Sequence, residues 1–225
     1  MGFRSLILKT PKKCNIFYGA FCTNSAEIIH KNEDNLKEWK KELHATMKVF
    51  PNFISEDEEN SILKEMEPYL KRLRYEFSHW DNAIHGYRET ERSQWNEENL
   101  RIIDKIRNKA FPPGTPQLAY VHVLDLTAEG WIKPHVDSVR FCGDIIAGIS
   151  LLSNCVMRLT SVESEDHKED FLLPRRSLYI MSGVARNKYN HEVLKDADSF
   201  FKGEKVPRER RISVICRCEP NPRED

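Results

Sequence analysis

Residues 211–217 read Arg-Ile-Ser-Val-Ile-Cys-Arg, and their alternation predicts a β-strand, which we place over Arg211–Cys218. Side chains two residues apart on a strand point to the same side. One side therefore carries both arginines, in the set Arg211, Ser213, Ile215 and Arg217. The other side carries Ile212, Val214 and Cys216. If the first side lines the interior of a barrel, two guanidinium groups lie inside it.

Six further short segments upstream of this strand have the composition of strands. They are Ala119–Leu126, Ile145–Leu152, Val156–Val162, Asp170–Leu173, Ser177–Met181 and His191–Leu194. Glycine and proline residues fall between them and mark turns. This half of the chain is therefore expected to be a series of short strands.

Two amphipathic helices are predicted before the strands. The first begins after a capping box at Ser55 and Glu58, covers Glu56–Arg74, and is expected to kink or break at Pro68. Its buried face is expected to carry Ile62, Met66, Leu70 and Leu73. The second helix covers Glu97–Ala110, is stopped by Pro112-Pro113, and is expected to bury Leu100, Ile103 and Ile106.

Helices followed by strands, without βαβ alternation, indicate an α+β fold. We expect a double-stranded β-helix (jelly roll) with the N-terminal helices packed on one sheet. We expect the domain to span residues 49–218, after a charged linker at 26–48 and before a tail at 219–225.

The N-terminal residues 1–25 have the composition of a mitochondrial presequence, which would place the mature protein in the matrix. Four basic residues, Arg4, Lys9, Lys12 and Lys13, occur there, and no acidic residue precedes Glu27. A basic disordered tail is the alternative. We expect no membrane span, because the longest apolar runs are far too short for one.

Charge and cysteine content exclude several classes of protein. Basic and acidic residues number 35 each, so the chain lacks the basic excess of a general nucleic-acid binder. The six cysteines form no CxxC pair, and Cys216 and Cys218 are two apart on one expected strand. That spacing suits neither a zinc site nor a disulfide framework, so we expect reduced structural thiols.

A first candidate metal-binding segment is Lys133-Pro134-His135-Val136-Asp137. In extended chain His135 and Asp137 point to one side and can converge on a metal ion. Two histidines and one carboxylate form the facial triad of non-haem Fe(II) oxygenases, so a further histidine would have to come from a distant strand. A polar pair at a strand end is the alternative.

The arginine pair suggests what else such a site would bind. Guanidinium groups keep their charge, and burying two of them without anions would cost several kcal/mol each. A small molecule with two carboxylates is a suitable partner for Arg211 and Arg217, because arginine binds carboxylates bidentately. An edge strand with solvated arginines is the alternative. A third segment, 182–191, is a turn that leads into His191 at the start of a strand.

Together the three segments resemble the AlkB family of Fe(II)/2-oxoglutarate-dependent dioxygenases. The family pattern is HxD, then a G-x-A-R-x-x-x-x-H-like segment, then R-x-x-x-x-x-R, and all three occur here in order. Four further stretches, 80–86, 121–125, 132–138 and 210–217, are similar to a mitochondrial branch of that family. The resemblance covers about residues 49–218.

The resemblance implies an oxidoreductase that uses Fe(II), 2-oxoglutarate and O2. It implies that His135, Asp137 and His191 ligate the iron, that Arg211 binds the distal carboxylate of 2-oxoglutarate, and that Arg217 lies near its iron-chelating end. Tyr179 would offer a hydroxyl to the cosubstrate, and Ser213 is a weaker candidate for the same pocket. It also implies a part in fatty-acid metabolism and in programmed necrosis.

Departures from the family concern the substrate. Repair members carry Asn-x-Tyr upstream of HxD, where this chain has Leu124-Asp125-Leu126. Their base-holding lid has one candidate here, Tyr75–Trp95, which offers aromatic residues without a basic bias and which could instead be a surface loop. We therefore expect a protein or small-molecule substrate and disfavour duplex nucleic acid. The alternatives are demethylation of bases in single-stranded mitochondrial RNA and a non-catalytic metal-binding jelly-roll regulator.

Overall fold

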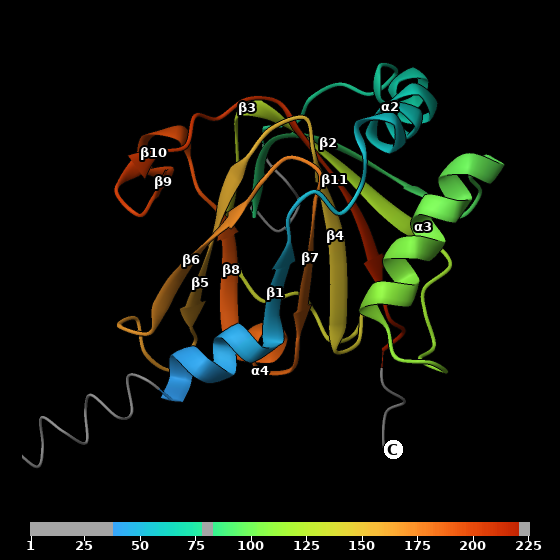
Figure 1. Ribbon diagram of the computed structural model, residues 1–225. Coiled ribbons are helices and arrows are strands. Elements are labelled where there is room, and N and C mark those ends of the chain that lie inside the picture. Colours follow the sequence, from blue (N-terminus) through green and yellow to red (C-terminus); the bar gives the residue numbers. More distant parts are fainter. Residues whose placement is uncertain (1–37, 78–82, 221–225) are drawn as a thin grey trace, which may run out of the picture. The chain divides into compact units, whose positions relative to one another are not determined.

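Strands dominate the computed structural model, which describes residues 38–77 and 83–220 (Figure 1). The main strands are β1 (Met47–Phe50), β2 (Ile84–Arg92), β3 (Val121–His135), β4 (Ile145–Leu151), β5 (Cys155–Ser161), β6 (Lys168–Leu173), β7 (Ser177–Ser182), β8 (Tyr189–Val193) and β11 (Arg211–Arg217). The structure also contains helices α2 (Glu56–Leu70), α3 (Glu97–Ala110) and α4 (Gly183–Asn187). A 3-10 turn, η1 (Asp196–Asp198), precedes a small hairpin formed by β9 (Phe200–Phe201) and β10 (Glu204–Lys205).

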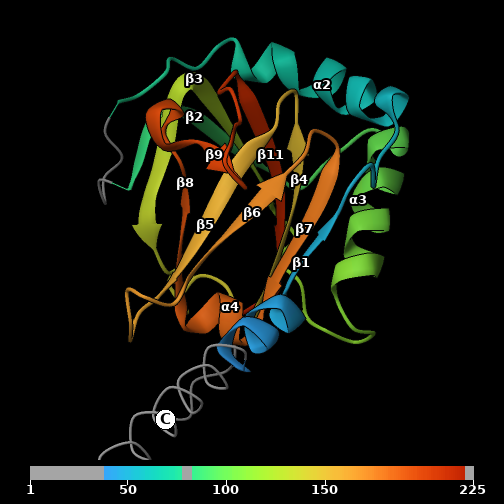
Figure 2. The same ribbon diagram turned by 60° about the vertical axis from the view of Figure 1, so that its left-hand side comes forward.

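Strand β3 connects the two layers of the fold. Its first half pairs with β11 and β2, and its last residues pair with β8. The strand order β1-β7-β4-β11-β3-β8-β5-β6 is antiparallel throughout and curls into a nearly closed barrel (Figures 1 and 2). The expected jelly-roll type of fold is therefore confirmed.

The two faces of β11 enter different cores, as the alternation predicted. Ile212, Val214 and Cys216 pack with residues of α2 and α3 outside the barrel. Ile215 belongs to the core inside the barrel. The expectation that helices cover one sheet is correct, and α3 lies beside β4 and β11 in Figure 1.

Helix α2 starts where expected and ends earlier. The capping box is present: the Ser55 hydroxyl accepts from the Glu58 backbone N–H, and the Glu58 carboxylate accepts from the Ser55 N–H. The predicted extension to Arg74 and the break at Pro68 are wrong, because one continuous helix ends at Leu70. Pro68 removes the one hydrogen bond that its N–H would have made to the carbonyl of Lys64, and the helix continues for two residues beyond it. Leu73, expected to be buried, is consequently 38% exposed.

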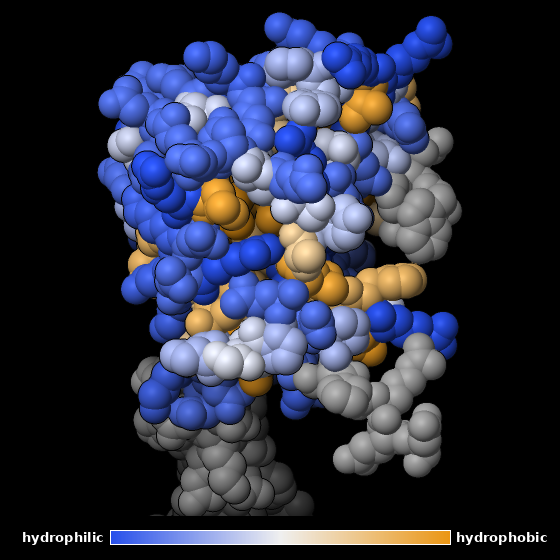
Figure 3. Space-filling view, turned by 90° about the vertical axis from the view of Figure 1, so that its right-hand side faces the viewer, coloured by the Kyte–Doolittle hydropathy of each residue, from blue (hydrophilic) through white to orange (hydrophobic). Residues whose placement is uncertain are grey.

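Helix α3 has the predicted bounds but a rotated buried face. Ile102, Ile103 and Ile106 are buried, whereas Leu100, which was expected to be buried, is 44% exposed. The reason is tertiary: Asn99 faces α2 and donates from its side-chain amide to Ser61 O and Glu65 Oε2. The face of the molecule where α3 lies is largely hydrophilic, with hydrophobic residues surfacing in separate patches (Figure 3).

The predicted linker over 26–48 is wrong for its described part. Residues 38–46 are helical and lead directly into β1, which pairs with β7. Trp39, Leu43 and Met47 enter the core inside the barrel. Trp39 and Leu43 are four residues apart, so they share one face of this helix, and their burial outweighs the surrounding charge. The rest of the linker and the predicted presequence, 1–25, lie outside the described residues, as does most of the tail.

The segment Tyr75–Trp95, expected to be a lid or a surface loop, contains strand β2. Residues Ile84–Arg92 pair with β3 along most of their length, so this part is an added edge of the sheet. Gly86 sits at a bulge in β2 with φ +64°, a conformation that favours glycine. A Cβ there would come within 3.0 Å of Gly130 Cα on β3.

The other strands lie close to their predicted bounds, with one large difference. Strand β3, expected to end at Leu126, continues to His135, because its last residues pair with β8 and Gly130 leaves room for the close approach of the Gly86 carbonyl of β2. The four cysteines among the described residues, Cys142, Cys155, Cys216 and Cys218, are free and buried, as expected. In the described part of the chain, no helix has the length and apolar character needed to cross a bilayer.

Candidate active site

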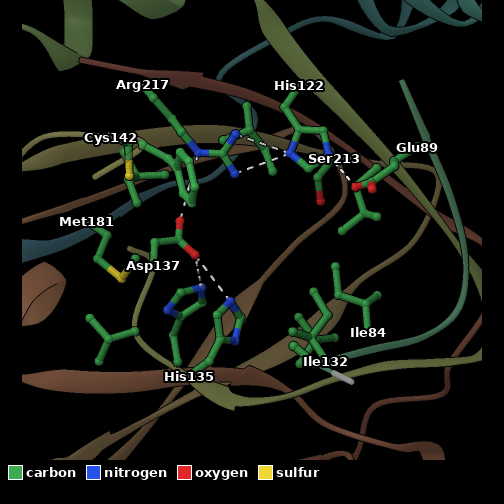
Figure 4. Close-up of a pocket in the computed structure, with 18 of the residues that line it drawn as sticks. Ile84, Glu89, His122, Ile132, His135, Asp137, Cys142, Met181, Ser213 and Arg217 are labelled. Carbon is green, nitrogen blue, oxygen red and sulfur yellow. Dashed lines mark hydrogen bonds and ion pairs between the residues drawn. The ribbon is translucent and has the colours of Figure 1, made fainter. Parts of the chain in front are cut away.

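A cavity of about 650 Å³ lies between the two layers of the barrel. It is lined by every residue that the sequence analysis proposed for a site, namely His135, Asp137, Tyr179, His191, Arg211, Ser213 and Arg217 (Figure 4). They come from β3, the turn after it, β7, β8 and β11. The fold thus brings together side chains that are far apart in the sequence.

Three of these residues converge as a possible metal site. His135 on β3 and His191 on β8 are direct cross-strand partners, and their ring centroids lie 4.3 Å apart. Asp137 Oδ1 lies 3.2 Å from His135 Nε2 and 3.9 Å from His191 Nε2. One potential ligand atom from each residue lies within 4.8 Å of the others, close enough for one ion.

Hydrogen bonding prepares His135 for a metal. Its Nδ1–H donates to the backbone carbonyl of Lys133 at 2.8 Å, which leaves Nε2 directed toward Asp137. A nitrogen lone pair and a carboxylate oxygen at 3.2 Å repel each other unless a proton or a cation lies between them. The geometry therefore fits a bound cation.

Electrostatics favour the forms of Asp137 and His191 that bind metals. Burial lowers the pKa of His191 to about 4, helped by nearby cationic groups and against the pull of Asp137, so its imidazole is neutral at physiological pH. Burial would raise the pKa of Asp137, but its interactions with His135, His191 and Arg217 outweigh burial and lower that pKa. Metal ligands must be deprotonated, and both are.

Arg211 is a buried cation without a counter-ion. Its side chain is 1% exposed, and its Nε donates to Ser150 Oγ at 2.9 Å. Its Nη2 is buried without a hydrogen-bond partner, and among the described residues no carboxylate pairs with it. A carboxylate on a ligand would satisfy both its charge and its free donor.

Arg217 lies nearer the three possible metal ligands. Its Nε is 3.8 Å from Asp137 Oδ2, and both terminal nitrogens are 3.2 Å from His122 Nδ1 (Figure 4). The two arginines thus stand at different depths of one pocket. A small diacid could contact both and still reach the metal.

Tyr179 and Ser213 complete the polar lining. Burial raises the pKa of Tyr179 to about 12, although Arg211 and Arg217 act in the opposite direction, so the phenol is a neutral donor. Tyr179 fits against Gly148 of β4, its partner in the strand register. A Cβ at Gly148 would lie 2.6 Å from the Tyr179 hydroxyl oxygen. Ser213 is 2% exposed on the same face of β11 as the arginines.

Sequence reasoning missed several pocket residues. His122 and Leu124 both line the cavity from β3, and Glu89 lines it from β2. The period-two alternation of β3 could have placed His122 on the inner face, because it shares parity with Leu124. The local sequence does not show that β2 pairs with β3, so Glu89 could be assigned to the pocket only from the structure.

Comparisons with known proteins agree with this chemistry. The pattern of the 2OG-Fe(II) oxygenase superfamily matches residues 33–217. Two proteins named Alpha-ketoglutarate-dependent dioxygenase alkB homolog 7, mitochondrial, from Mus musculus and Bos taurus, are each 52% identical over 172 residues, covering 76% of this chain and 78% of theirs.

A solved structure shares the fold at much lower identity. It is a prolyl hydroxylase from Trichoplax adhaerens in complex with a hypoxia inducible factor oxygen degradation domain peptide fragment. It is 10% identical, with a TM-score of 0.55, and the match covers 85% of this chain and 92% of that one. At this identity the likeness extends to the fold alone.

Proposed function

The chain belongs to the 2OG-Fe(II) oxygenase superfamily, and from this premise we propose that His135, Asp137 and His191 hold the iron of a dioxygenase. Members of the family use Fe(II), 2-oxoglutarate and O2. Two imidazoles and a carboxylate are the ligand set that leaves one face of Fe(II) open. The convergence of one potential ligand atom from each of the three residues in one cavity supports this assignment.

The same proposal assigns the cosubstrate contacts. Arg211 binds the distal carboxylate of 2-oxoglutarate, with Ser150 orienting its guanidinium and the Tyr179 hydroxyl donating beside it. Arg217 faces the end of the cosubstrate nearer the iron, and Ser213 lines the wall between the arginines. Bound iron supplies the oxidative chemistry, in which 2-oxoglutarate and O2 yield succinate and CO2 and one oxygen atom enters a substrate C–H bond. The barrel orients the reactants and excludes water.

The single observation that carries the proposal is the buried guanidinium of Arg211, which has an unpartnered Nη2 and, among the described residues, no carboxylate partner, in the same cavity as His135, Asp137 and His191. The test is succinate formation from 2-oxoglutarate with Fe(II) and O2. Wild type should form succinate, and His135→Ala should not. His44→Ala is the matched control, because His44 pairs with Glu169 on the exposed surface. Equal turnover by His135→Ala would contradict the ligand assignment.

For the substrate we propose a protein or a small molecule. Glu89 and Glu91 line the pocket from β2, and their carboxylates would repel a phosphodiester backbone. The lid candidate is Tyr75–Trp95, and its described part consists largely of strand β2, which is hydrogen-bonded to β3 in the sheet. Mass spectrometry of mitochondrial proteins and RNAs, with wild type against His135→Ala, tests this choice: gain of one oxygen on a peptide or metabolite supports it, whereas loss of a methyl group from RNA bases favours the alternative demethylase.

For the location we propose the mitochondrial matrix. The mitochondrial relatives from mouse and cattle support a mitochondrial location, and the basic residues 1–25 would serve as the presequence. N-terminal analysis of the mature protein from purified mitochondria should find those residues removed, and an intact N-terminus would contradict the proposal. The link to fatty-acid metabolism and programmed necrosis stays a prediction from the family resemblance.

A further inference from the structure

A chain of three side chains crosses the wall of the pocket beside the metal triad. Arg217 of β11 contacts His122 of β3, and His122 contacts Glu89 of β2 (Figure 4). The three strands are adjacent, with His122 paired to Ile215 on one side and to Glu91 on the other. The contacts are diagonal ones across the same sheet face, within reach of long side chains.

The hydrogen bonds determine which nitrogen of His122 carries the proton. Both terminal nitrogens of Arg217 can only donate, so His122 Nδ1, at 3.2 Å from each, must be the acceptor. The proton is then on Nε2, which donates to Glu89 Oε2 at 2.8 Å. Glu89 thereby selects the tautomer of His122 that can hold Arg217.

Arg217 has a competing partner close by. Its Nε forms a loose ion pair with Asp137 Oδ2 at 3.8 Å, beyond hydrogen-bond distance but near enough for a small rotation to form a hydrogen bond. A guanidinium bonded to that carboxylate would compete with the metal ion for Asp137. The pocket side chains of Arg217 and His122 are 21% and 13% exposed, so their interactions are only weakly screened by water.

We infer that His122 and Glu89 are positioning residues that hold Arg217 away from Asp137. The restraint keeps the Asp137 carboxylate available to the metal and directs the guanidinium toward the cosubstrate. Leu124, the next inward-facing residue of β3, has no polar side-chain atom, so it cannot hold Arg217 by a hydrogen bond. The inference rests on the proposed function for the identity of the cosubstrate.

The test measures binding rather than turnover. Calorimetry gives the affinity of full-length protein for Mn²⁺, as a substitute for Fe(II), and then for 2-oxoglutarate. His122→Leu should weaken both affinities by about 10-fold, within the range seen for residues that orient metal ligands. His122→Asn should restore them to within about 3-fold of wild type, because its amide can accept from Arg217 and donate to Glu89.

Two further variants separate positioning from folding. Glu89→Leu, at the more exposed end of the chain of contacts, should weaken the same affinities by a smaller factor. His44→Leu removes a surface His–Glu pair and should change neither. Wild-type affinities in both His122→Leu and Glu89→Leu, or equal losses in His122→Asn and His122→Leu, would overturn the inference. Absence of succinate formation by wild type would instead refute the proposed function while leaving the metal-affinity comparison valid.

Discussion

Arg210 and Arg211 are consecutive residues with opposite environments. Arg210 lies outside the barrel, where its Nε and Nη2 donate to the two oxygens of Asp125 at 3.0 and 2.8 Å and its Nη1 donates to Glu67. Arg211 lies inside, where its Nε donates to the hydroxyl of Ser150. Two carboxylates bind the guanidinium of Arg210, whereas within residues 38–77 and 83–220 no carboxylate binds that of Arg211.

The partners of a buried charge distinguish a structural charge from a candidate ligand-binding charge. On the outer face the buried carboxylates are paired: Asp125 also accepts from Arg88 and Tyr75, and Glu59 accepts from Arg175 and from the Leu152 N–H. An isolated buried charge costs several kcal/mol, and a bound anion can offset that cost. The paired outer charges belong to the fold, whereas the inner guanidinium of Arg211 has the environment expected of an anion-binding group.

The largest expected effect is on the outer face. Asp125→Ala should lower the free energy of unfolding by about 3–5 kcal/mol, because it leaves Arg88 and Arg210 without their shared carboxylate. Urea denaturation measures the change.

Asp170→Ala serves as the matched control for that substitution. Asp170 also binds an arginine bidentately, Arg158, but both side chains are 27% exposed. We expect a loss of about 1 kcal/mol or less there. If the two substitutions destabilise equally, burial does not distinguish the two faces.

A second effect should appear in acid, at the inner pocket. The pKa of His191 is about 4 in the folded protein against an ordinary value of 6.5, so between these values the unfolded chain binds a proton that the folded protein does not. The contribution of His191 to the free energy of unfolding is fully present above pH 6.5 and is lost as the pH falls toward 4. The expected loss is on the order of 3 kcal/mol.

Denaturation of chelator-treated protein at pH 7.5 and 4.5 measures that loss. His191→Asn lacks the titrating imidazole, so its stability should fall less over the same interval. An identical fall in wild type and His191→Asn would contradict the assignment of this pH dependence to the pocket.

The smallest effect concerns the fit of Tyr179 against Gly148. Gly148→Ala places a Cβ 2.6 Å from the Tyr179 hydroxyl oxygen and must displace the ring. We expect 2-oxoglutarate affinity to fall by about 1 kcal/mol, the usual contribution of one hydrogen bond. Tyr179→Phe should cause a similar loss, and the double variant should lose little more than either one. Additive losses would mean that Gly148 acts elsewhere.

Local patterns predicted what depends on local chemistry. The alternation of β11 placed Arg211 inside and Ile212 outside, and the capping box located the start of α2. The HxD and arginine spacings led to the pocket because strand parity alone decides which side chains share a face.

What failed depended on pairing between distant segments. Strand β2 is rich in charged residues, so its sequence alone indicates a loop. Only its pairing with β3 shows that it is a strand. Leu100 is exposed because Asn99 is bound to α2, which no helical pattern reveals. His122 acquires its role only through the registers of β2 and β11 with β3.

The most direct test of the account compares the unfolding free energies of wild type and Arg211→Met, each with Mn²⁺, with and without 2-oxoglutarate. Without the cosubstrate, Arg211→Met should be at least as stable as wild type, because it removes a buried charge that has no counter-ion. A concentration of 100 times Kd should stabilise wild type by about 2.7 kcal/mol and the variant hardly at all. A strongly destabilised variant, or equal stabilisation of both proteins by 2-oxoglutarate, would contradict the claim that Arg211 is reserved for a ligand.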